Sequence, residues 1–495
     1  MTHDIGTSSD KAALVTLDGE VIRHASFSYQ ISSPRPGWQE QNPVDWWRAF
    51  CECSAQLLEG IDRAQVIGVS LTGQMMGCVP VDSQGEPVCP AMIWADSRAV
   101  SENSGIEQRI GLQRYYEITG LRPSPTGSVS KIAWLKNNRP DLYLRTAYFL
   151  SAKDYIGYRL TGIPAMDPEN AAYMYCFDRK KNVWSQEILD IYGIDMKKMP
   201  PVIPGAQVIG SIRREAADEC GLVAGTPVVM AIGDGGAVTL GTGTLDKGEV
   251  YTSLGTSSWV CAISDPDITD KECRFAKINY LGTTRDTGAM QAGGYSFNWI
   301  RSTILADDAV KNADCVNRLA EQSVPGSHGV VFLPYLLGER APYWDPYLRG
   351  SFLGLSGVTD RPDLCRSVME GVGVHLGIIY RLIVGVNQIS NIKYMKLVGG
   401  GARSRLWQSI LADAYGLPVA VPKQAEHVGA LGVAVLAGVG LKVFNDVSVV
   451  KKFQEVEHVV QPNEENALLF QKLQSIHIRA KTALDCVKQD LVDLE

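Results

Sequence analysis

The sequence repeats one short phrase at two positions about half a chain apart, and this repeat limits the possible folds more than any other feature. The stretch DIGTSSDKAALVTLDGEV begins at Asp4, and SLGTSSWVCAISD begins at Ser253. In both copies GTSS is a turn of small and hydroxyl residues, and a stretch rich in β-forming residues follows it. A chain of 495 residues is also too long for one hydrophobic core. We therefore predict two domains that arose by duplication of one α/β unit.

Short apolar stretches that end at glycines alternate with helical patterns along the chain. The first pattern, typical of a buried strand that ends in a turn, occurs in residues 64–74, 226–236 and 392–404. Residues 42–61 show the apolar stripe of an amphipathic helix. The alternation indicates α/β layers, with ligands at the carboxyl ends of the strands. We expect a boundary near residues 237–246, which gives an N-terminal domain of residues 1–240 and a C-terminal domain of residues 241–495.

Composition argues against several classes of function. The net charge is −7, and no segment is polybasic, so neither nucleic acid nor an anionic membrane is an expected partner. No apolar run approaches the roughly 20 residues that span a bilayer, and the start, MTHDIGTSSDK, lacks the layout of a signal peptide. The eleven cysteines are odd in number and show no CxxC spacing, which argues against zinc and disulfides. Reduced thiols and a cytoplasmic location are the expectation.

The two GTSS turns can bind phosphate or can be ordinary hairpins. Such a turn presents backbone N–H groups and hydroxyls to an anion, and Lys11 adds a positive charge beside the first one. One turn from each half could hold the phosphates of one nucleotide. The chain has no GK dipeptide and no GxGxxG, so the nucleotide would not bind through a P-loop or a Rossmann fingerprint. Glycine, threonine and serine are also common turn formers, which leaves the hairpin interpretation open.

The segment VGGGARS, residues 398–404, follows a predicted strand and opens a predicted helix. Its three glycines would let a flat ring or a phosphate approach the backbone. A tight connection between strand and helix would use the same residues, so both interpretations are retained.

Asp234 is a single carboxylate between Gly233 and Gly235, after an apolar stretch. It can be the N-cap of a helix that starts near Gly235. It can also be a general base, because flanking glycines let a substrate hydroxyl approach within hydrogen-bond reach. A metal site would require further carboxylates, and the local sequence has none. These residues alone support the N-cap and the general-base interpretations of Asp234 equally.

The segment PAMIWADSRAV places an aromatic ring and two opposite charges at alternate positions. If residues 94–98 are extended, the side chains of Trp94, Asp96 and Arg98 share one face. Such a face suits a polyol, because the carboxylate accepts hydroxyl protons, the guanidinium donates, and the ring is an apolar wall. A surface ion pair beside a core tryptophan explains the same pattern.

Together, these segments resemble the FGGY family of carbohydrate kinases, in order along nearly the whole chain. SVSKIAWLKNN (residues 128–138) resembles the first family signature, and GSFLGLSGVTDRPDLCRSVMEG (residues 350–371) resembles the second. The GTSS turns resemble the phosphate loops, KLVGGGARSRLWQSILADAYGLPV resembles the adenosine segment, and AIGDGGAV resembles the segment of the catalytic Asp. The resemblance implies two actin-like (ribonuclease H-like) α/β domains with a cleft between them. It also implies transfer of a phosphoryl group from ATP, with Mg²⁺, to a sugar hydroxyl.

The resemblance also implies roles for individual residues. Asp234 is implied as the base for the sugar hydroxyl, and Asp4 as the acid near Mg²⁺ and the transferring phosphoryl group. The residues that fall on phosphate-contacting positions are Thr7, Ser8, Gly255 and Thr256, with Lys11 beside the first turn. The residues that fall on the adenosine site are Gly399, Gly400, Gly401 and Ala402. The residues that fall on or beside sugar-contacting segments are Gln74, Met75, Met76, Trp94, Asp96 and Arg98.

Within the family, EQNPVDWW, GQMMG, WADSR and LGERAPYWDP look most like the xylulokinases, which favours D-xylulose as substrate and D-xylulose 5-phosphate as product. Two positions depart from that pattern. Met76 replaces a usual His, and Gly235 replaces a usual polar residue after the catalytic Asp. Each change removes a hydrogen-bonding side chain from the expected sugar site. Gluconate, another ketopentose or a tetrulose are therefore alternative substrates.

The start of the chain is the third departure. Family members usually have an apolar strand before the first turn, whereas only three residues precede Asp4 here. We expect this strand to be missing or truncated and Asp4 to be loosely held, which would suit a non-catalytic sugar sensor. An actin-like chaperone ATPase or assembly protein is a further alternative. The expected partners are ATP and a sugar or polyol, with a homodimer left open and with neither nucleic acid nor membrane.

Overall fold

The computed structural model describes residues 1–303 and 313–494 of the chain. These residues divide into two compact units. The first unit contains Met1–Gly243, Lys277–Thr284 and His427–Gln454, and the second contains Thr244–Ala276, Arg285–Glu426 and Glu455–Glu495. The chain thus leaves the first unit after Gly243 and returns to it twice. The domains predicted from the sequence, residues 1–240 and 241–495, are continuous segments, whereas each compact unit is built from several segments. The two predicted domains therefore stay a prediction.

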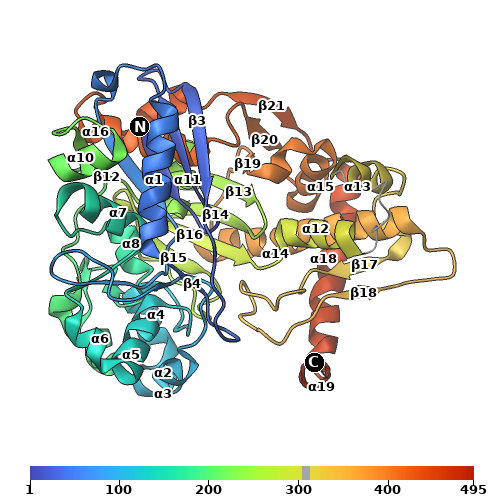
Figure 1. Cartoon of the computed structure of the whole chain (residues 1–495). Helices are drawn as coiled ribbons and strands as arrows, with labels where there is room; N and C mark the ends of the chain where they lie inside the picture. The colour runs from blue at the N-terminus through green and yellow to red at the C-terminus, as the bar shows by residue number, and fades with distance from the viewer. Residues whose placement is uncertain (304–312, 495) are drawn as a thin grey trace. The chain divides into compact units, whose positions relative to one another are not determined.

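A six-stranded sheet forms the centre of the first unit, in the order β11-β12-β5-β1-β2-β3. Its strands are β1 (Thr2–Ile5), β2 (Ser9–Val15), β3 (Val21–Ser28), β5 (Val69–Gly73), β11 (Val208–Ser211) and β12 (Pro227–Met230). The helices packed with it are α1 (Pro43–Leu57), α7 (Ala152–Thr161), α11 (Asp234–Gly241) and α16 (Val428–Gly440), and α10 (Arg214–Cys220) packs against α1 and α7. Helix α1 lies along β2 and β3 (Figure 1). Apolar side chains of the sheet and of α1 and α7 form the core of this unit.

The first strand is short but complete, so the expectation of a missing strand and a loosely held Asp4 was wrong. Strand β1 pairs antiparallel with β2 and parallel with β5, and Asp4 is in register with Lys11 and Thr72. The amino group of Met1 donates to the carbonyl of Gly68 at 3.0 Å. Ladder hydrogen bonds on both edges hold the strand, so four residues are enough to place Asp4 in the middle of the sheet.

The second unit repeats the same topology, which confirms the predicted duplication. The sheet has the order β15-β16-β14-β13-β19-β20-β21, and all its strands except β15 lie wholly or mainly in the second unit. The strands are β13 (Val250–Leu254), β14 (Ser258–Ser264), β15 (Ala276–Tyr280), β16 (Thr283–Met290), β19 (Met395–Val398), β20 (Val419–Pro422) and β21 (Val456–Val460). Strand β13 pairs antiparallel with β14 and parallel with β19, as β1 pairs with β2 and β5. Strands β20 and β21 are antiparallel, as are β12 and β11.

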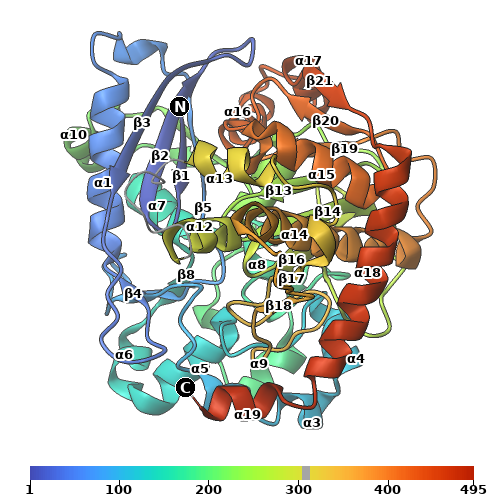
Figure 2. The ribbon, with the colours of Figure 1, turned by 90° about the vertical axis from the view of Figure 1, so that its right-hand side faces the viewer.

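Helix α14 (Arg361–Asn387) is the long central helix of the second unit. By length and composition it could cross a membrane, which the search for apolar runs in the sequence missed. Most of it is buried inside the protein, as a core helix would be. Its neighbours include α12 (Gly293–Thr303), α13 (Ala313–Ala320), α15 (Arg405–Tyr415) and α18 (Glu464–Leu484). Figure 2 shows α18 running beside α14 and α15.

The remaining elements are shorter. The strands are β4 (Glu40–Gln41), β6 (Val79–Val81), β7 (Ala91–Met92), β8 (Tyr148–Leu150), β9 (Phe177–Asp178), β10 (Val183–Trp184), β17 (Val331–Leu333) and β18 (Ser351–Leu353). The α-helices are α2 (Val100–Asn103), α3 (Ile106–Ile110), α4 (Leu112–Thr119), α5 (Ser128–Asn138), α6 (Pro140–Arg145), α8 (Pro168–Ala172), α9 (Gln186–Tyr192), α17 (Val450–Phe453) and α19 (Lys488–Asp493). The 3₁₀ turns are η1 (Arg63–Gln65), η2 (Met196–Lys198), η4 (Ser327–Gly329), η5 (Gly400–Arg403) and η6 (Val447–Val449).

Candidate active site

Asp234 is the first residue of α11, shortly after β12 ends at Met230. The N-cap position belongs to Gly233, which offers no side-chain cap, so the interpretation of Asp234 as the N-cap was wrong. The Oδ1 atom of Asp234 accepts the N–H of Gly235 at 2.7 Å. The positive end of the helix dipole and this N–H both stabilise a carboxylate at the first turn.

The glycines beside Asp234 make room for protein side chains. A Cβ at Gly233 would lie 2.2 Å from the sulfur of Met75 and 2.9 Å from Oδ1 of Asn170. A Cβ at Gly236 would lie 1.8 Å from Oε2 of Glu169. The sequence predicted that the small residues beside Asp234 let a substrate hydroxyl approach, and the structure shows that Met75, Asn170 and Glu169 fill part of that space.

Asp4 lies within electrostatic reach of Asp234. The pKa of Asp4 is raised from 3.8 to about 7, first by burial and then by the negative charge of Asp234. Lys11 opposes this shift, and Asp10 adds to it. Two carboxyl groups that disfavour each other's charge form a site that a cation or a transferred proton would stabilise. The structure therefore brings together the two acids that the sequence placed at the reacting centre.

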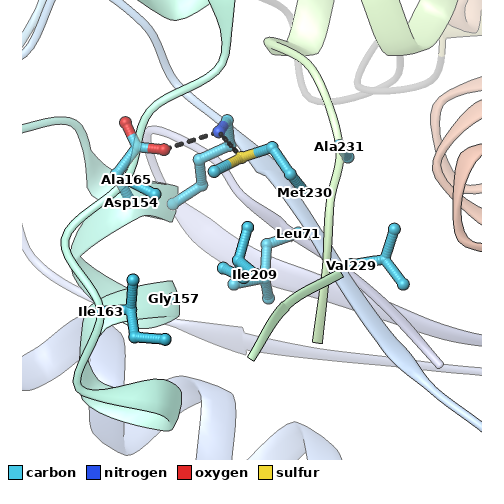
Figure 3. A pocket seen from close by; sticks show the side chains of 10 residues that line it. Leu71, Asp154, Gly157, Ile163, Ala165, Ile209, Val229, Met230 and Ala231 are labelled. Carbon is cyan, nitrogen blue, oxygen red and sulfur yellow. Dashed lines mark hydrogen bonds and ion pairs between the residues drawn. The ribbon is translucent and has the colours of Figure 1, made fainter. Parts of the chain in front are cut away.

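A buried ionic network lies beside the strand that leads to Asp234. The ammonium of Lys153 contacts Asp154 at 2.6 Å, Asp167 at 2.8 Å and the sulfur of Met230 at 3.4 Å. Burial alone would lower the pKa of Lys153, but the two carboxylates outweigh it and raise the pKa. Figure 3 shows Asp154 and Met230 toward one end of a small cavity whose other lining includes Leu71.

The network extends from this cavity to the neighbourhood of Gly233. Asp167 caps α8 by accepting the N–H groups of Glu169 and Asn170 at 2.9 and 3.1 Å. The amide of Asn170 donates to Ser151 at 2.8 Å, and its Oδ1 faces the position described above at Gly233. Sequence reasoning missed these residues, because nothing local in the sequence connects Lys153 with the loop before Asp234.

Lys131 joins the two segments that were predicted to contact the sugar. Its ammonium donates to the carbonyl of Met76 at 2.8 Å and to that of Ile93 at 2.7 Å, and the side chain is fully buried. Burial lowers the pKa of Lys131 from 10.5 to about 7, although Asp96 opposes the shift. Met76 has a left-handed backbone, with φ of 61°. The first family signature contained Lys131 and was the signal that could have identified it.

Residues 94–98 form turns rather than an extended segment, so the predicted shared face was wrong. The carboxylate of Asp96 is fully buried and receives Arg98 on both oxygens, at 3.0 and 2.7 Å. Arg98 also pairs with Glu40 at 2.7 Å and lies 3.6 Å from the ring centre of Trp38. This ion pair is buried, not on the surface as in the other interpretation. It holds the loop, because its acceptor and donor groups are already used.

Trp94 points toward the first GTSS turn. Its indole N–H donates to the hydroxyl of Thr7 at 2.9 Å, and the side chain is partly exposed. Gln74 is nearly buried, and its amide donates to the carbonyl of Gly6 at 3.2 Å. Trp94 and Gln74 thus contact the turn, and Met75 contacts the neighbourhood of Asp234. The residues predicted to contact the sugar therefore lie in three places. Trp94 and Gln74 lie at the first GTSS turn, Met75 lies near Asp234, and Asp96 and Arg98 hold the loop of residues 94–98.

Both GTSS turns connect the strands of a hairpin. Thr7 and Ser8 lie between β1 and β2, and Gly255 and Thr256 lie between β13 and β14. The hairpin interpretation is therefore correct as geometry, and phosphate binding by the same turns stays a prediction. Lys11 is exposed on β2.

The glycine segment after β19 combines close packing with one open position. Gly399 has φ of 88°, and a Cβ at Gly401 would lie 2.3 Å from the side chain of Leu254. A Cβ at Gly400 would meet no atom within 4 Å, whereas Ala402 is buried. Gly399 and Gly401 therefore fit the interpretation of a tight connection, and ligand binding at this segment, where Gly400 has open space, stays a prediction.

The residues present fit a magnesium nucleotide. Mg²⁺ takes few protein ligands and is held by one or two carboxylates together with phosphate oxygens. Asp4 meets that requirement, and a nearby cation would relieve its repulsion with Asp234. Within residues 1–303 and 313–494 there is no group of three or more His, Cys, Asp and Glu side chains that could hold a metal by protein ligands alone.

Known proteins resemble this chain over almost its whole length. The N-terminal domain of the FGGY family of carbohydrate kinases matches residues 1–241, and the C-terminal domain matches residues 250–441. A xylulose kinase from Staphylococcus xylosus is 30% identical over 477 residues, which cover 96% of this chain and 98% of that protein. A gluconokinase from Bacillus licheniformis is 28% identical over 494 residues, which cover 97% and 95%.

Solved structures agree. A gluconate kinase from Lactobacillus acidophilus has a TM-score of 0.93 at 27% identity and covers 99% of this chain and 98% of its own. A ligand-bound xylulose kinase from the same organism also has a TM-score of 0.93 at 27% identity, with coverages of 99% and 100%. The fold is the mixed α/β, two-domain fold of the actin-like ATPase class, and the reaction is phosphoryl transfer to an alcohol group. The chain belongs to the FGGY family of carbohydrate kinases.

Proposed function

We propose that this kinase transfers the γ-phosphoryl group of ATP to D-xylulose and forms D-xylulose 5-phosphate. The observation that carries the proposal is the pair of Asp4 and Asp234, two acids at the carboxyl ends of β1 and β12 whose charges influence each other. The choice of sugar is supported by xylulose kinases that are 30% identical over nearly the whole chain. Gluconokinases at 27% and 28% identity make gluconate the first alternative, followed by another ketopentose or a tetrulose.

In this mechanism Asp234 orients the acceptor hydroxyl and takes its proton. An alcohol is far too weak an acid to lose its proton beforehand at neutral pH, so the proton moves to Asp234 as the bond to phosphorus forms. Asp4 and phosphate oxygens would hold Mg²⁺, which supplies charge neutralisation when bound. The small turns at Gly6 and Gly255 position the phosphates, because phosphoryl transfer depends mainly on position and charge.

The structure weakens the main rival. The sensor interpretation depended on a damaged first strand, and β1 is formed and paired on both edges. The proposal also includes a reducing, cytoplasmic setting, for which the support is that all eleven cysteines are free thiols.

A coupled assay of ADP release over a panel of D-xylulose, D-ribulose, D-gluconate and D-erythrulose tests the proposal. We expect ADP release that depends on Mg²⁺ and is fastest with D-xylulose. Fastest release with gluconate would keep the kinase and replace the sugar. ADP release that no sugar stimulates would indicate an ATPase of another class. Thermal stabilisation by a sugar without any ADP would indicate a sensor.

A further inference from the structure

The carbonyl groups of the first GTSS turn are all occupied by hydrogen-bond donors of the protein. The carbonyl of Gly6 accepts the hydroxyl of Tyr29 at 2.5 Å and the amide of Gln74 at 3.2 Å. The carbonyl of Thr7 accepts the amide of Gln41 at 2.7 Å. The carbonyl of Ser8 accepts the backbone N–H of Tyr29 at 3.1 Å. Three successive carbonyls are thereby fixed on the protein side of the turn.

Two backbone N–H groups of the same turn, in contrast to its carbonyls, have no hydrogen-bond partner within the described part of the chain. Within the described part of the chain, the backbone N–H groups of Thr7 and Ser8 donate to no acceptor. A turn with its carbonyls bound on one side and its N–H groups left over presents a concave set of donors to an anion. The hydrogen bonds around the turn thus favour an anion such as a phosphate over a cation.

In the second turn the carbonyls of Gly255 and Thr256 are likewise bound, and their donors are mainly backbone N–H groups, with the hydroxyl of Ser258 also donating to Gly255 at 3.2 Å. The carbonyl of Gly255 accepts the N–H of Gly294 at 2.8 Å, and the carbonyl of Thr256 accepts the N–H of Tyr295 at 3.0 Å. Both donors belong to the first turn of α12. Where the second unit uses the start of a helix, the first unit uses the side chains of Gln41, Gln74 and Tyr29. The duplicated turns therefore receive the same support from different sources.

The side-chain support in the first unit is rigid. Gln41 and Gln74 are nearly buried, and the amide of Gln74 also donates to Oε1 of Gln41 at 2.8 Å. The same oxygen accepts the indole N–H of the buried Trp46 at 3.1 Å. A buried amide is costly unless its hydrogen bonds are made, so this network admits few alternative positions for the Gln41 side chain.

We propose that Gln41, with Gln74 and Tyr29, is a positioning residue that holds the first turn in its anion-binding form. The proposal rests on the proposed function, in which this turn contacts nucleotide phosphate. It gives Gln74 a role at the turn, where the sequence pattern suggested a contact with the sugar. It also predicts that Gln41 affects the binding of phosphate groups and not the binding of adenosine.

The test compares ADP with adenosine in the variant Gln41→Met. Methionine has nearly the same shape but donates nothing to the Thr7 carbonyl. Calorimetry should show that the variant binds ADP about tenfold more weakly, as expected when the Thr7 carbonyl loses the one hydrogen bond that Gln41 donates to the turn, and binds adenosine as the parent does. Tyr29→Phe removes only the hydroxyl that donates to the Gly6 carbonyl, so it should weaken ADP binding by a smaller factor and leave adenosine binding unchanged. This second variant tests the proposal if Gln41→Met does not fold.

The matched control is Gln474→Met, in the second unit. Gln474 is also buried, donates to a backbone carbonyl, that of Ala414, at 2.9 Å, and contacts neither turn. It should lower stability but leave the ratio of ADP to adenosine affinity unchanged.

Three results would overturn the proposal. Equal weakening of ADP and adenosine would make Gln41 a general structural residue. Unchanged ADP affinity in folded Gln41→Met and Tyr29→Phe would show that the turn needs no such support. A parent chain that binds no ADP would refute the proposed function itself, and the positioning role with it.

Discussion

The contact between α11 and α16 can be tested by adding a single methyl group at Gly241. Gly241 is the last residue of α11 and faces Val428, the first residue of α16. A Cβ at Gly241 would lie 1.6 Å from the carbonyl oxygen of Val428 and 2.4 Å from its carbonyl carbon. Both atoms are backbone, so no side-chain rotation can relieve the overlap. In Gly241→Ala one of the helices must therefore move by more than 1 Å to restore ordinary contact distances of about 3.4 Å.

This movement should affect both stability and turnover. Overpacking costs about 1–3 kcal/mol or more, and alanine regains about 1 kcal/mol of helix propensity. We therefore expect the free energy of unfolding to fall by about 2 kcal/mol. Asp234 is at the other end of the same short helix. A displacement near 1 Å at a reacting group can cost about 10²-fold, so kcat should fall by up to that factor.

Urea unfolding and the coupled kinase assay measure the two effects. The control is Gly385→Ala in α14, where a Cβ would meet no atom within 4 Å. That exposed helical site should gain up to about 1 kcal/mol and keep full activity. A Gly241→Ala variant as stable and as active as the parent would refute the close contact between α11 and α16 and the link from α16 to Asp234.

Three further predictions concern Asp4, Lys131 and Gly400. Because the pKa of Asp4 is about 7 in the folded chain and 3.8 ordinarily, the folded state binds the proton more tightly, and the free energy of unfolding should fall as pH rises from about 4 to 7. Asp4→Asn should remove its part of this fall in urea melts at pH 4.5 and 7.5, and an unchanged difference between the two pH values would contradict the shift. Lys131→Met leaves the carbonyls of Met76 and Ile93 without the ammonium that donates to them. The KM for the sugar should therefore rise about tenfold while the KM for ATP stays constant. Equal changes in the two KM values would contradict a role of Lys131 at the sugar segments. The added methyl group of Gly400→Ala would meet no protein atom within 4 Å, so the melting temperature should not change. We expect this variant to bind adenosine more weakly, because the methyl group would occupy space beside the nucleotide. Unchanged affinity for adenosine would remove Gly400 from the nucleotide site.

The sequence predicted those features whose cause is local or repeated. The two GTSS hairpins, the duplicated sheet topology and the strand before Asp234 follow from short patterns, and the structure confirms them. The first strand was expected to be missing or truncated because only three residues precede Asp4. Its stability comes instead from ladder hydrogen bonds to β2 and β5, and β5 is distant in sequence.

The missed site residues depend on partners far away in the sequence. Lys131 joins Met76 to Ile93, and no spacing rule connects α5 with those two loops. Asp96 and Arg98 looked like sugar ligands because alternation was read as extended backbone, whereas a turn brings them together as a buried pair. Gly233 was expected to leave room for substrate, but the side chains of Met75 and Asn170 approach it. Local sequence patterns show which residues could contact a ligand. Tertiary packing, which these patterns do not contain, determines which of those residues are instead bound by other parts of the protein.

The most direct test of the central claim is the turnover of Asp234→Asn. The asparagine Oδ1 can still accept the N–H of Gly235 that Asp234 accepts at 2.7 Å, so the helix start should persist and the variant should bind ADP and sugar as the parent does. Loss of the base should lower kcat by about 10²–10⁴-fold. Near-normal kcat in a folded variant that binds both ligands would contradict the role of Asp234 as the base.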